Sequence, residues 1–182
     1  MERSASHPWQ SPLCDWLAVA VIVMAAMLAP VQVWSQQFSI EHKSDSLSML
    51  KLQCGNHTGT WELPYPVFRF ETADVNGDGS VDAVVGVYKS SRFFPNPSRR
   101  VFIFKNFDGD IRPLWLSSRL GGELYDFTVV DGNIRAIEVM TCGGDYVIND
   151  YAWQGFGMGH VKQVAAFNNL EQCYNFLNIL PL

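Results

Sequence analysis

The stretch of sequence that decides the fold is Asp74-Val75-Asn76-Gly77-Asp78-Gly79-Ser80-Val81-Asp82. Oxygen-bearing side chains occupy positions 74, 76, 78 and 82, and glycines stand where a tight loop has to turn. Ca²⁺ takes about six to eight oxygen ligands, several of them carboxylates, at roughly 2.3–2.6 Å. The alternative is a glycine-rich turn without a metal. The pattern predicts a Ca²⁺ loop whose ligands are the side chains of Asp74, Asn76, Asp78 and Asp82 and the carbonyl oxygen of Ser80.

The residues on either side of this loop predict strands. Residues 66–73 and 81–88 are rich in Val, Phe and Tyr, and the first of them alternates apolar with polar side chains. A helix-flanked calcium loop needs a bidentate Glu at its twelfth position, which is Val85 here. A strand–loop–strand site takes its last carboxylate earlier, at Asp82, because the chain is already extended there.

In this respect residues 74–82 resemble the calcium-binding β-hairpin loops of integrin-type (FG-GAP and VCBS-like) β-propeller repeats. Closed propellers have at least about four blades of four strands, whereas the chain shows strands for about two. Asp108-Gly109-Asp110 is at best a degenerate second copy of the motif. We therefore expect a mainly β fold, a small antiparallel meander, curved sheet or sandwich that resembles one to two propeller-type blades.

The rest of the chain continues as short strands and tight turns. Turn signals at Asp108-Gly109, Asp131-Gly132-Asn133 and Gly143-Gly144 separate apolar stretches. Phe167, Leu170, Tyr174 and Leu177 then recur at helical spacing and predict an amphipathic C-terminal helix over 168–179, with an irregular tail as the alternative. The expected strands are residues 100–105, 111–116, 124–130, 134–139 and 146–153.

The N-terminus predicts export. No charged residue interrupts residues 16–31, an apolar run long enough for a membrane-inserting helix. Val33 and Ser35 are small enough for the signal peptidase pockets, so cleavage between Ser35 and Gln36 is expected. An uncleaved N-terminal membrane anchor is the alternative. Residues 1–35 are thus a signal peptide or anchor, residues 36–182 form a single β-rich domain, and the protein is periplasmic, extracellular or membrane-anchored.

Charge and cysteine content narrow the function classes. The full chain has 13 Lys+Arg and 18 Asp+Glu. Without Arg3, Glu2 and Asp15, residues 36–182 keep 12 and 16, a net charge of −4 that argues against a nucleic-acid partner. Export permits disulfides. Without Cys14, the three cysteines of residues 36–182 allow at most one bridge, or remain free, and the sequence does not choose a pair among Cys54, Cys142 and Cys173.

A wider resemblance covers residues 61–157. The pattern is similar to that of a group of exported proteins from gram-negative gut bacteria, and it implies a compartment and a fold but no activity. It is carried by Trp61-Glu62-Leu63, Tyr65-Pro66-Val67-Phe68-Arg69-Phe70-Glu71, the calcium loop, Val85-Gly86-Val87-Tyr88-Lys89, Arg92-Phe93, Phe102-Ile103-Phe104, Ile111-Arg112-Pro113-Leu114-Trp115, Ser118-Arg119-Leu120-Gly121-Gly122 and Trp153-Gln154-Gly155-Phe156-Gly157.

The chain shows no nucleophile elbow, zinc-protease motif, phosphate loop or dinucleotide fingerprint. Cys142 with His160 could form a thiol nucleophile and base. A pair drawn from Glu71, Glu123 and Glu138 could serve as a glycosidase acid and base. We expect structural or surface roles for these residues and no catalytic residue. An exported hydrolase with an unrecognised site is the alternative function.

Five arginines fall in the segment that also holds Phe93, Phe94 and Trp115, although the chain as a whole is acidic. Guanidinium groups suit carboxylates or phosphates, and aromatic rings supply stacking faces. The alternative is that these arginines pair with local carboxylates. The sequence predicts a non-catalytic, Ca²⁺-stabilised cell-envelope module that binds a protein or glycan through Arg92, Phe93, Arg99, Arg100, Arg112, Trp115 and Arg119.

Overall fold

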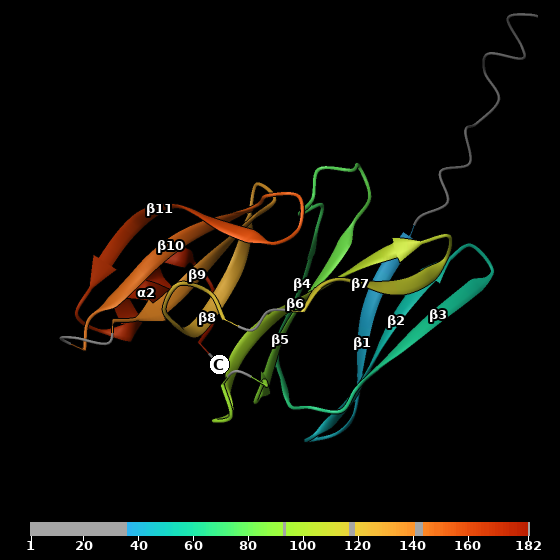
Figure 1. The fold of residues 1–182 in the computed structure, drawn as a ribbon, viewed down its shortest axis with the longest axis horizontal. Coiled ribbons are helices and arrows are strands. Elements are labelled where there is room, and N and C mark those ends of the chain that lie inside the picture. Colours follow the sequence, from blue (N-terminus) through green and yellow to red (C-terminus); the bar gives the residue numbers. More distant parts are fainter. Residues whose placement is uncertain (1–35, 93, 117–118, 141–143, 182) are drawn as a thin grey trace, which may run out of the picture. The chain divides into compact units, whose positions relative to one another are not determined.

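The computed structural model describes residues 36–92, 94–116, 119–140 and 144–181 (Figure 1). These residues belong to one compact unit, Ser35–Leu182. The predicted signal or anchor segment, residues 1–35, lies outside the described residues, and so do Phe93 and Cys142. Within the described part of the chain, no helix is long and apolar enough to span a membrane.

The described residues form three antiparallel sheets, which follow one another along the chain. The N-terminal sheet contains β1 (Gln36–Ser44), β2 (Leu47–Cys54) and β3 (His57–Leu63). The middle sheet contains β4 (Val67–Ala73), β5 (Asp82–Lys89), β6 (Ser98–Phe107) and β7 (Asp110–Leu116). The C-terminal sheet contains β8 (Glu123–Val130), β9 (Asn133–Val139), β10 (Tyr146–Trp153) and β11 (Met158–Phe167), and helix α2 (Leu170–Leu177) follows it.

The mainly β, antiparallel fold and the C-terminal helix are confirmed, but the expected extent of the sheet structure was wrong. Instead of one sheet or sandwich of one to two blades, the described chain has three sheets. The N-terminal sheet was missed, although β2 alternates buried Leu50 and Leu52 with more exposed side chains. Strand β11 was missed because most of its side chains are exposed or only half-buried, so it shows no clear apolar alternation.

Two hydrophobic cores lie on opposite faces of the middle sheet. Strand β5 shows why, because Val85 and Val87 belong to the core shared with the N-terminal sheet, while Val84 belongs to the core shared with the C-terminal sheet. A strand covered on both faces is apolar throughout, and the β5 sequence is almost so. The middle sheet therefore packs between the N-terminal sheet and the C-terminal sheet (Figure 1).

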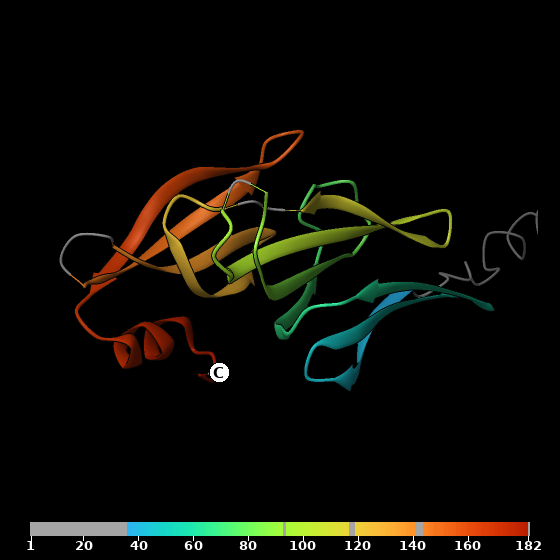
Figure 2. The same ribbon diagram turned by 60° about the horizontal axis from the view of Figure 1, so that its bottom comes forward.

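Helix α2 covers the remaining face of the C-terminal sheet (Figure 2). Its buried residues, Cys173 and Tyr174, pack against Ile137 and Ile148. The Asn169 side chain caps the first turn by accepting a hydrogen bond from the Gln172 N–H at 2.9 Å. Cys173 and the half-buried Cys54 are free thiols, as the alternative without a bridge expects for these two.

Polar side chains of β4 tie the middle sheet to the C-terminal sheet. Arg69 donates from Nε to Oδ1 of the buried Asp126 at 2.9 Å, and its Nη2 bonds the other carboxylate oxygen. On the same strand, the Glu71 carboxylate accepts hydrogen bonds from the Val129 N–H at 2.7 Å and from the Thr128 hydroxyl at 3.1 Å. Because both partners are on β8, these contacts fix how the two sheets meet.

Candidate functional site

The predicted calcium loop joins β4 to β5 and is closed around the Asp74 carboxylate. Asp74 Oδ1 accepts hydrogen bonds from the backbone N–H groups of Gly77 at 2.7 Å and Asp78 at 3.2 Å, and Oδ2 accepts from Gly79 at 2.9 Å. Gly77 and Gly79 have φ angles of 74° and 83°, which favour glycine. The two glycines thus allow the chain to turn around one carboxylate.

Asp82 begins β5 at the other end of the loop, and its side chain is fully buried. Its Oδ2 accepts a hydrogen bond from the Val75 N–H at 3.1 Å, whereas its Oδ1 is buried and has no hydrogen-bond partner among the described residues. Burial, aided by the nearby charges of Asp78 and Asp74, raises the pKa of Asp82 to about 6, although the backbone N–H groups of Val75 and Asn76 act in the opposite direction. The loop therefore ends on a buried carboxylate.

Asn76 and Asp78 lie nearer the surface and bond to each other. The Asn76 amide donates to Asp78 Oδ2 at 2.9 Å and accepts from the Asp78 N–H at 2.9 Å. Asp78 Oδ1 accepts from the Ser80 N–H at 2.8 Å. These hydrogen bonds, the one from Asn76 first, hold the pKa of Asp78 below its usual value.

The structure brings the four predicted side-chain ligands into one loop, but it does not arrange them as a finished metal cage. Among the described residues, no group of three His, Cys, Asp or Glu side chains is placed to hold a metal ion. The Asp74 and Asp78 oxygens face the N–H groups of the loop, and only Asp82 offers a buried oxygen without a partner. The fit to Ca²⁺ thus depends on Asp82 and on lone pairs still open on the other carboxylates.

The loop lies where parts of all three described sheets come together. Gln36 of β1 donates from Nε2 to the Val81 carbonyl at 3.3 Å, and Asn106 of β6 donates to Gln36 Oε1 at 2.6 Å. On the other side, a Cβ atom on Gly132 in the β8–β9 turn would lie 2.8 Å from the Asp74 carbonyl oxygen. The loop is therefore in contact with both the N-terminal sheet and the C-terminal sheet.

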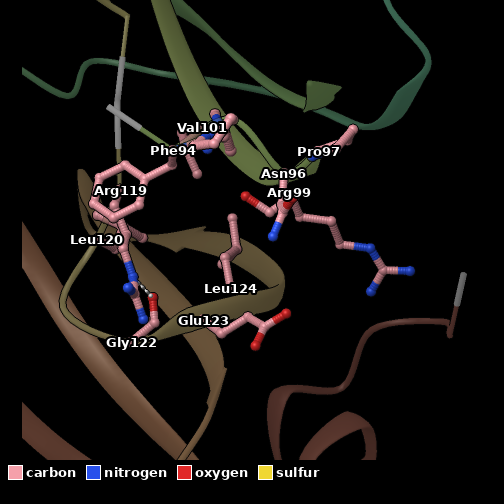
Figure 3. A pocket seen from close by; sticks show the side chains of 13 residues that line it. Phe94, Asn96, Pro97, Arg99, Val101, Arg119, Leu120, Gly122, Glu123 and Leu124 are labelled. Atoms are coloured by element: carbon pink, nitrogen blue, oxygen red, sulfur yellow. Dashed lines mark hydrogen bonds between the residues drawn. The ribbon is translucent and has the colours of Figure 1, made fainter. Parts of the chain in front are cut away.

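A second feature is a cavity of about 300 Å³ between the start of β6 and the segment that leads into β8 (Figure 3). We call it the arginine cavity. It combines guanidinium groups with an aromatic ring, two prolines and one carboxylate. Its lining residues are Phe94, Pro95, Asn96, Pro97, Ser98, Arg99, Arg100, Val101, Arg119, Leu120, Gly122, Glu123 and Leu124.

Arg100 is the most unusual residue of this cavity, because only 2% of its surface is exposed. Its Nε donates to the Lys89 carbonyl at 2.9 Å, but its Nη2 is buried and has no hydrogen-bond partner in the described part of the chain. The guanidinium carbons of Arg100 and Arg119 lie 5.8 and 5.6 Å from the centre of the Phe94 ring. Burial and the nearby Arg119 charge lower the pKa of Arg100. Two positive groups thus share one aromatic ring.

Arg99 serves a different role. It donates to the Tyr125 carbonyl, and its guanidinium carbon lies 4.5 Å from the Tyr125 ring centre and 5.3 Å from that of Phe68. Figure 3 shows its side chain directed away from Arg119. Arg119 donates from Nε to the Gly122 carbonyl at 3.3 Å, while the exposed Glu123 lies on the same wall. Arg100 and Arg119, but not Arg99, therefore flank the Phe94 ring in this cavity.

Of the seven residues predicted as a partner face, Phe93 lies outside the described residues and three line the arginine cavity. Arg99, Arg100 and Arg119 line the arginine cavity, but Arg92, Arg112 and Trp115 do not. Arg112 is exposed on β7, and Trp115 packs against the core between the middle and C-terminal sheets. The predicted partner face did not include Phe94, which was noted only as an aromatic residue near the arginines, or Glu123, which was considered only for catalysis. Their signals were the position of Phe94 before Pro95 and Pro97 and the closeness of Glu123 to Arg119 in the chain.

Two of the three carboxylates considered for catalysis, Glu71 and Glu138, have structural partners. Glu138 is buried, and its Oε1 accepts from the Gly122 N–H at 2.7 Å. Its Oε2 accepts from the Asn149 amide at 2.6 Å and the Tyr151 hydroxyl at 2.7 Å. Burial first, and then this contact with Glu138, raise the pKa of Tyr151. Glu138 thus joins three strands or loops of the C-terminal part, as Glu71 joins β4 to β8.

Comparisons of the chain with protein-family models, with curated proteins and with solved structures found no match. The function is therefore inferred from the geometry of the calcium loop and of the arginine cavity.

Proposed function

We propose that the chain is a non-catalytic, Ca²⁺-stabilised module that is exported to the cell envelope and binds a partner through the arginine cavity. The observation that supports it best is the Asp82 carboxylate, buried at the end of an Asp- and Asn-rich loop with its Oδ1 unpartnered. A buried charge without a partner costs on the order of several kcal/mol. A cation bound at this oxygen would remove that cost.

The rest of the loop can complete the coordination. An ionised carboxylate has about four acceptor positions, so the hydrogen bonds to Asp74 and Asp78 leave lone pairs for a metal. The residues that would hold the metal are Asp74, Asn76, Asp78, Asp82 and the Ser80 carbonyl. A hard oxygen-only donor set of this kind suits Ca²⁺ better than a transition metal.

Ca²⁺ would stabilise the fold because of where the loop lies. The loop contacts Gln36 of the N-terminal sheet and Gly132 of the C-terminal sheet. A ligand that binds only the folded protein adds its binding free energy to that of folding. Export would supply the metal, since extracellular modules work with dissociation constants of about 10⁻⁴–10⁻³ M.

The partners of Glu71 and Glu138 support a module without catalytic activity. Both carboxylates are engaged in contacts that hold strands together. The proposal expects no turnover of peptide, ester or glycoside substrates by the full chain. Turnover that disappears in a Glu138→Gln variant would favour the exported hydrolase instead.

Calorimetric titration of the full chain with Ca²⁺ and with Mg²⁺ tests the metal part of the proposal. We expect one equivalent of Ca²⁺ to bind and Mg²⁺ to bind poorly, because Mg²⁺ demands near-octahedral geometry. Asp82→Asn, which keeps the shape and removes the charge, should weaken Ca²⁺ binding at least about tenfold. The control is Asp108→Asn in the β6–β7 turn, where binding should not change. Equal Ca²⁺ binding by wild type and Asp82→Asn would contradict the proposal.

A further inference from the structure

We infer that the arginine cavity binds the carboxylate of an acidic sugar residue in an anionic glycan. The inference rests on the proposed function, because it names the partner of that module, and it adds the chemistry by which the partner is recognised. It depends on Arg100, Arg119, Phe94 and Glu123 and on the size of the cavity.

The guanidinium of Arg100 is a buried positive charge without a counter-ion among the described residues. None of the ion pairs between described residues includes Arg100 or Arg119. Buried polar groups nearly always have hydrogen-bond partners in native proteins, and an exception calls for an explanation. The Nη2 of Arg100 is buried without a hydrogen-bond partner among the described residues, and the positive charge of Arg119 lies near it. A bound carboxylate would neutralise this pair and accept hydrogen bonds from it.

The Glu123 carboxylate favours an acidic sugar over an inorganic anion as the ligand. Glu123 lines the same cavity, so a ligand should offer hydrogen-bond donors as well as negative charge. Sulfate and fully ionised phosphate only accept hydrogen bonds, so they have no donor to offer Glu123. A sugar acid carries its carboxylate beside several hydroxyl groups, which can donate to Glu123 and accept from the Asn96 amide.

The shape and size of the cavity also favour a sugar residue as the ligand. Phe94 is 39% exposed, and Pro95 and Pro97 line the same cavity. An aromatic face next to apolar rings suits the flat C–H face of a sugar. A volume of about 300 Å³ is at the lower limit for ligand sites. It holds one sugar residue of a chain that continues into solvent, which favours a glycan over an extended acidic peptide.

Chemical-shift titration of the full chain tests this inference. The probe is methyl galacturonoside, a single residue that avoids the strong Ca²⁺ binding of longer polyuronates. Methyl galactoside is the neutral control, and sulfate and a glutamate dipeptide represent the other anions. We expect saturable binding of the galacturonoside with shifts at the cavity residues. Methyl galactoside, sulfate and the dipeptide should bind at least about tenfold more weakly, the loss expected when one charge-assisted contact is missing.

Variants localise the effect. Arg119→Gln, on an exposed residue, should weaken binding of the galacturonoside at least about tenfold, and Arg100→Gln should do the same. Lys162→Gln removes an exposed positive charge from β11, outside the cavity, and should leave binding unchanged. If Arg100→Gln does not fold, Arg119→Gln decides the question. Equal binding by wild type and Arg119→Gln overturns the inference, and so does equal or tighter binding of the dipeptide, sulfate or neutral sugar.

The two proposals fail in different ways. Ca²⁺ binding without galacturonoside binding would overturn this inference and leave the calcium module intact. Galacturonoside binding by a chain that takes up no Ca²⁺ would support the cavity and contradict the calcium part of the proposed function.

Discussion

Gly132 in the β8–β9 turn lies directly against the backbone carbonyl of Asp74, so that a Cβ atom at position 132 would be 2.8 Å from that oxygen. Gly132 also has a φ of 75°, a conformation that other residues adopt only at a cost. The contact joins the candidate calcium loop to the C-terminal sheet. Glycine is therefore needed at this position for two independent reasons.

Gly132→Ala should lower the free energy of unfolding by about 2–4 kcal/mol, because it adds a backbone clash to the cost of the positive φ. Gly155→Ala is the matched control, since Gly155 has a φ of 86° and nothing within 4 Å of an added Cβ. It should cost only about 1–2 kcal/mol. Denaturant unfolding measures both, and equal losses would mean that the Asp74 contact does not constrain the turn.

Arg69→Met should destabilise the protein by about 3–5 kcal/mol. The substitution keeps an unbranched, flexible side chain but leaves the fully buried Asp126 without its cation. The Tyr174 hydroxyl would still donate to Asp126 Oδ2 at 3.1 Å, so helix α2 should stay docked. Chemical denaturation gives the value. A loss below about 1 kcal/mol, the range of exposed pairs, would show that the contact between β4 and β8 matters little.

Arg100→Met should behave in the opposite way. Its guanidinium is buried without a counter-ion among the described residues, so replacing it with an unbranched apolar side chain should leave stability unchanged or raise it by about 1 kcal/mol. Comparing its denaturation midpoint with that of Arg69→Met tests this contrast. A large loss of stability in Arg100→Met would show that the residue has a structural role rather than a role in binding.

Glu71 should make stability depend on pH. Burial is the main cause that raises the pKa of Glu71. Its folded pKa is then above the unfolded value, so the folded protein binds more protons in that interval and loses stability as pH rises through it. Glu71→Gln should therefore gain most over wild type at neutral pH, and this gain should shrink as the pH falls below the unfolded pKa. Unfolding curves at several pH values make the comparison, and a gain that grows toward acid pH would contradict it.

Local turns could be predicted from the sequence because single residues determine them. Asp108-Gly109 and Asp131-Gly132 are at positive φ in the β6–β7 and β8–β9 turns, as the Asp-Gly pairs indicated. Helix α2 begins and ends within the range that the spacing of Leu170, Tyr174 and Leu177 predicted, with Asn169 as its cap.

The stacking of the sheets could not be predicted, because apolar side chains do not specify which layer will cover them. Val84 and Val85 look alike in sequence, yet they belong to different cores. The arginine cavity could not be predicted from the sequence for the same reason. Arg100 and Arg119 meet at Phe94 only because β6 packs beside β8, and Trp115, which was grouped with them, packs into a core instead.

The measurement that tests the central claim most directly is calorimetric melting of wild type, Asp78→Ala and Asp108→Asn in chelator, Ca²⁺ and Mg²⁺. At Ca²⁺ a hundredfold above its dissociation constant, wild type and Asp108→Asn should gain about 2.7 kcal/mol, roughly 5–10 °C in melting temperature. Asp78→Ala should lose most of this gain, and Mg²⁺ should give little of it. Identical melting of wild type in chelator and in millimolar Ca²⁺ would contradict the account and reduce residues 74–82 to a hairpin turn without a metal.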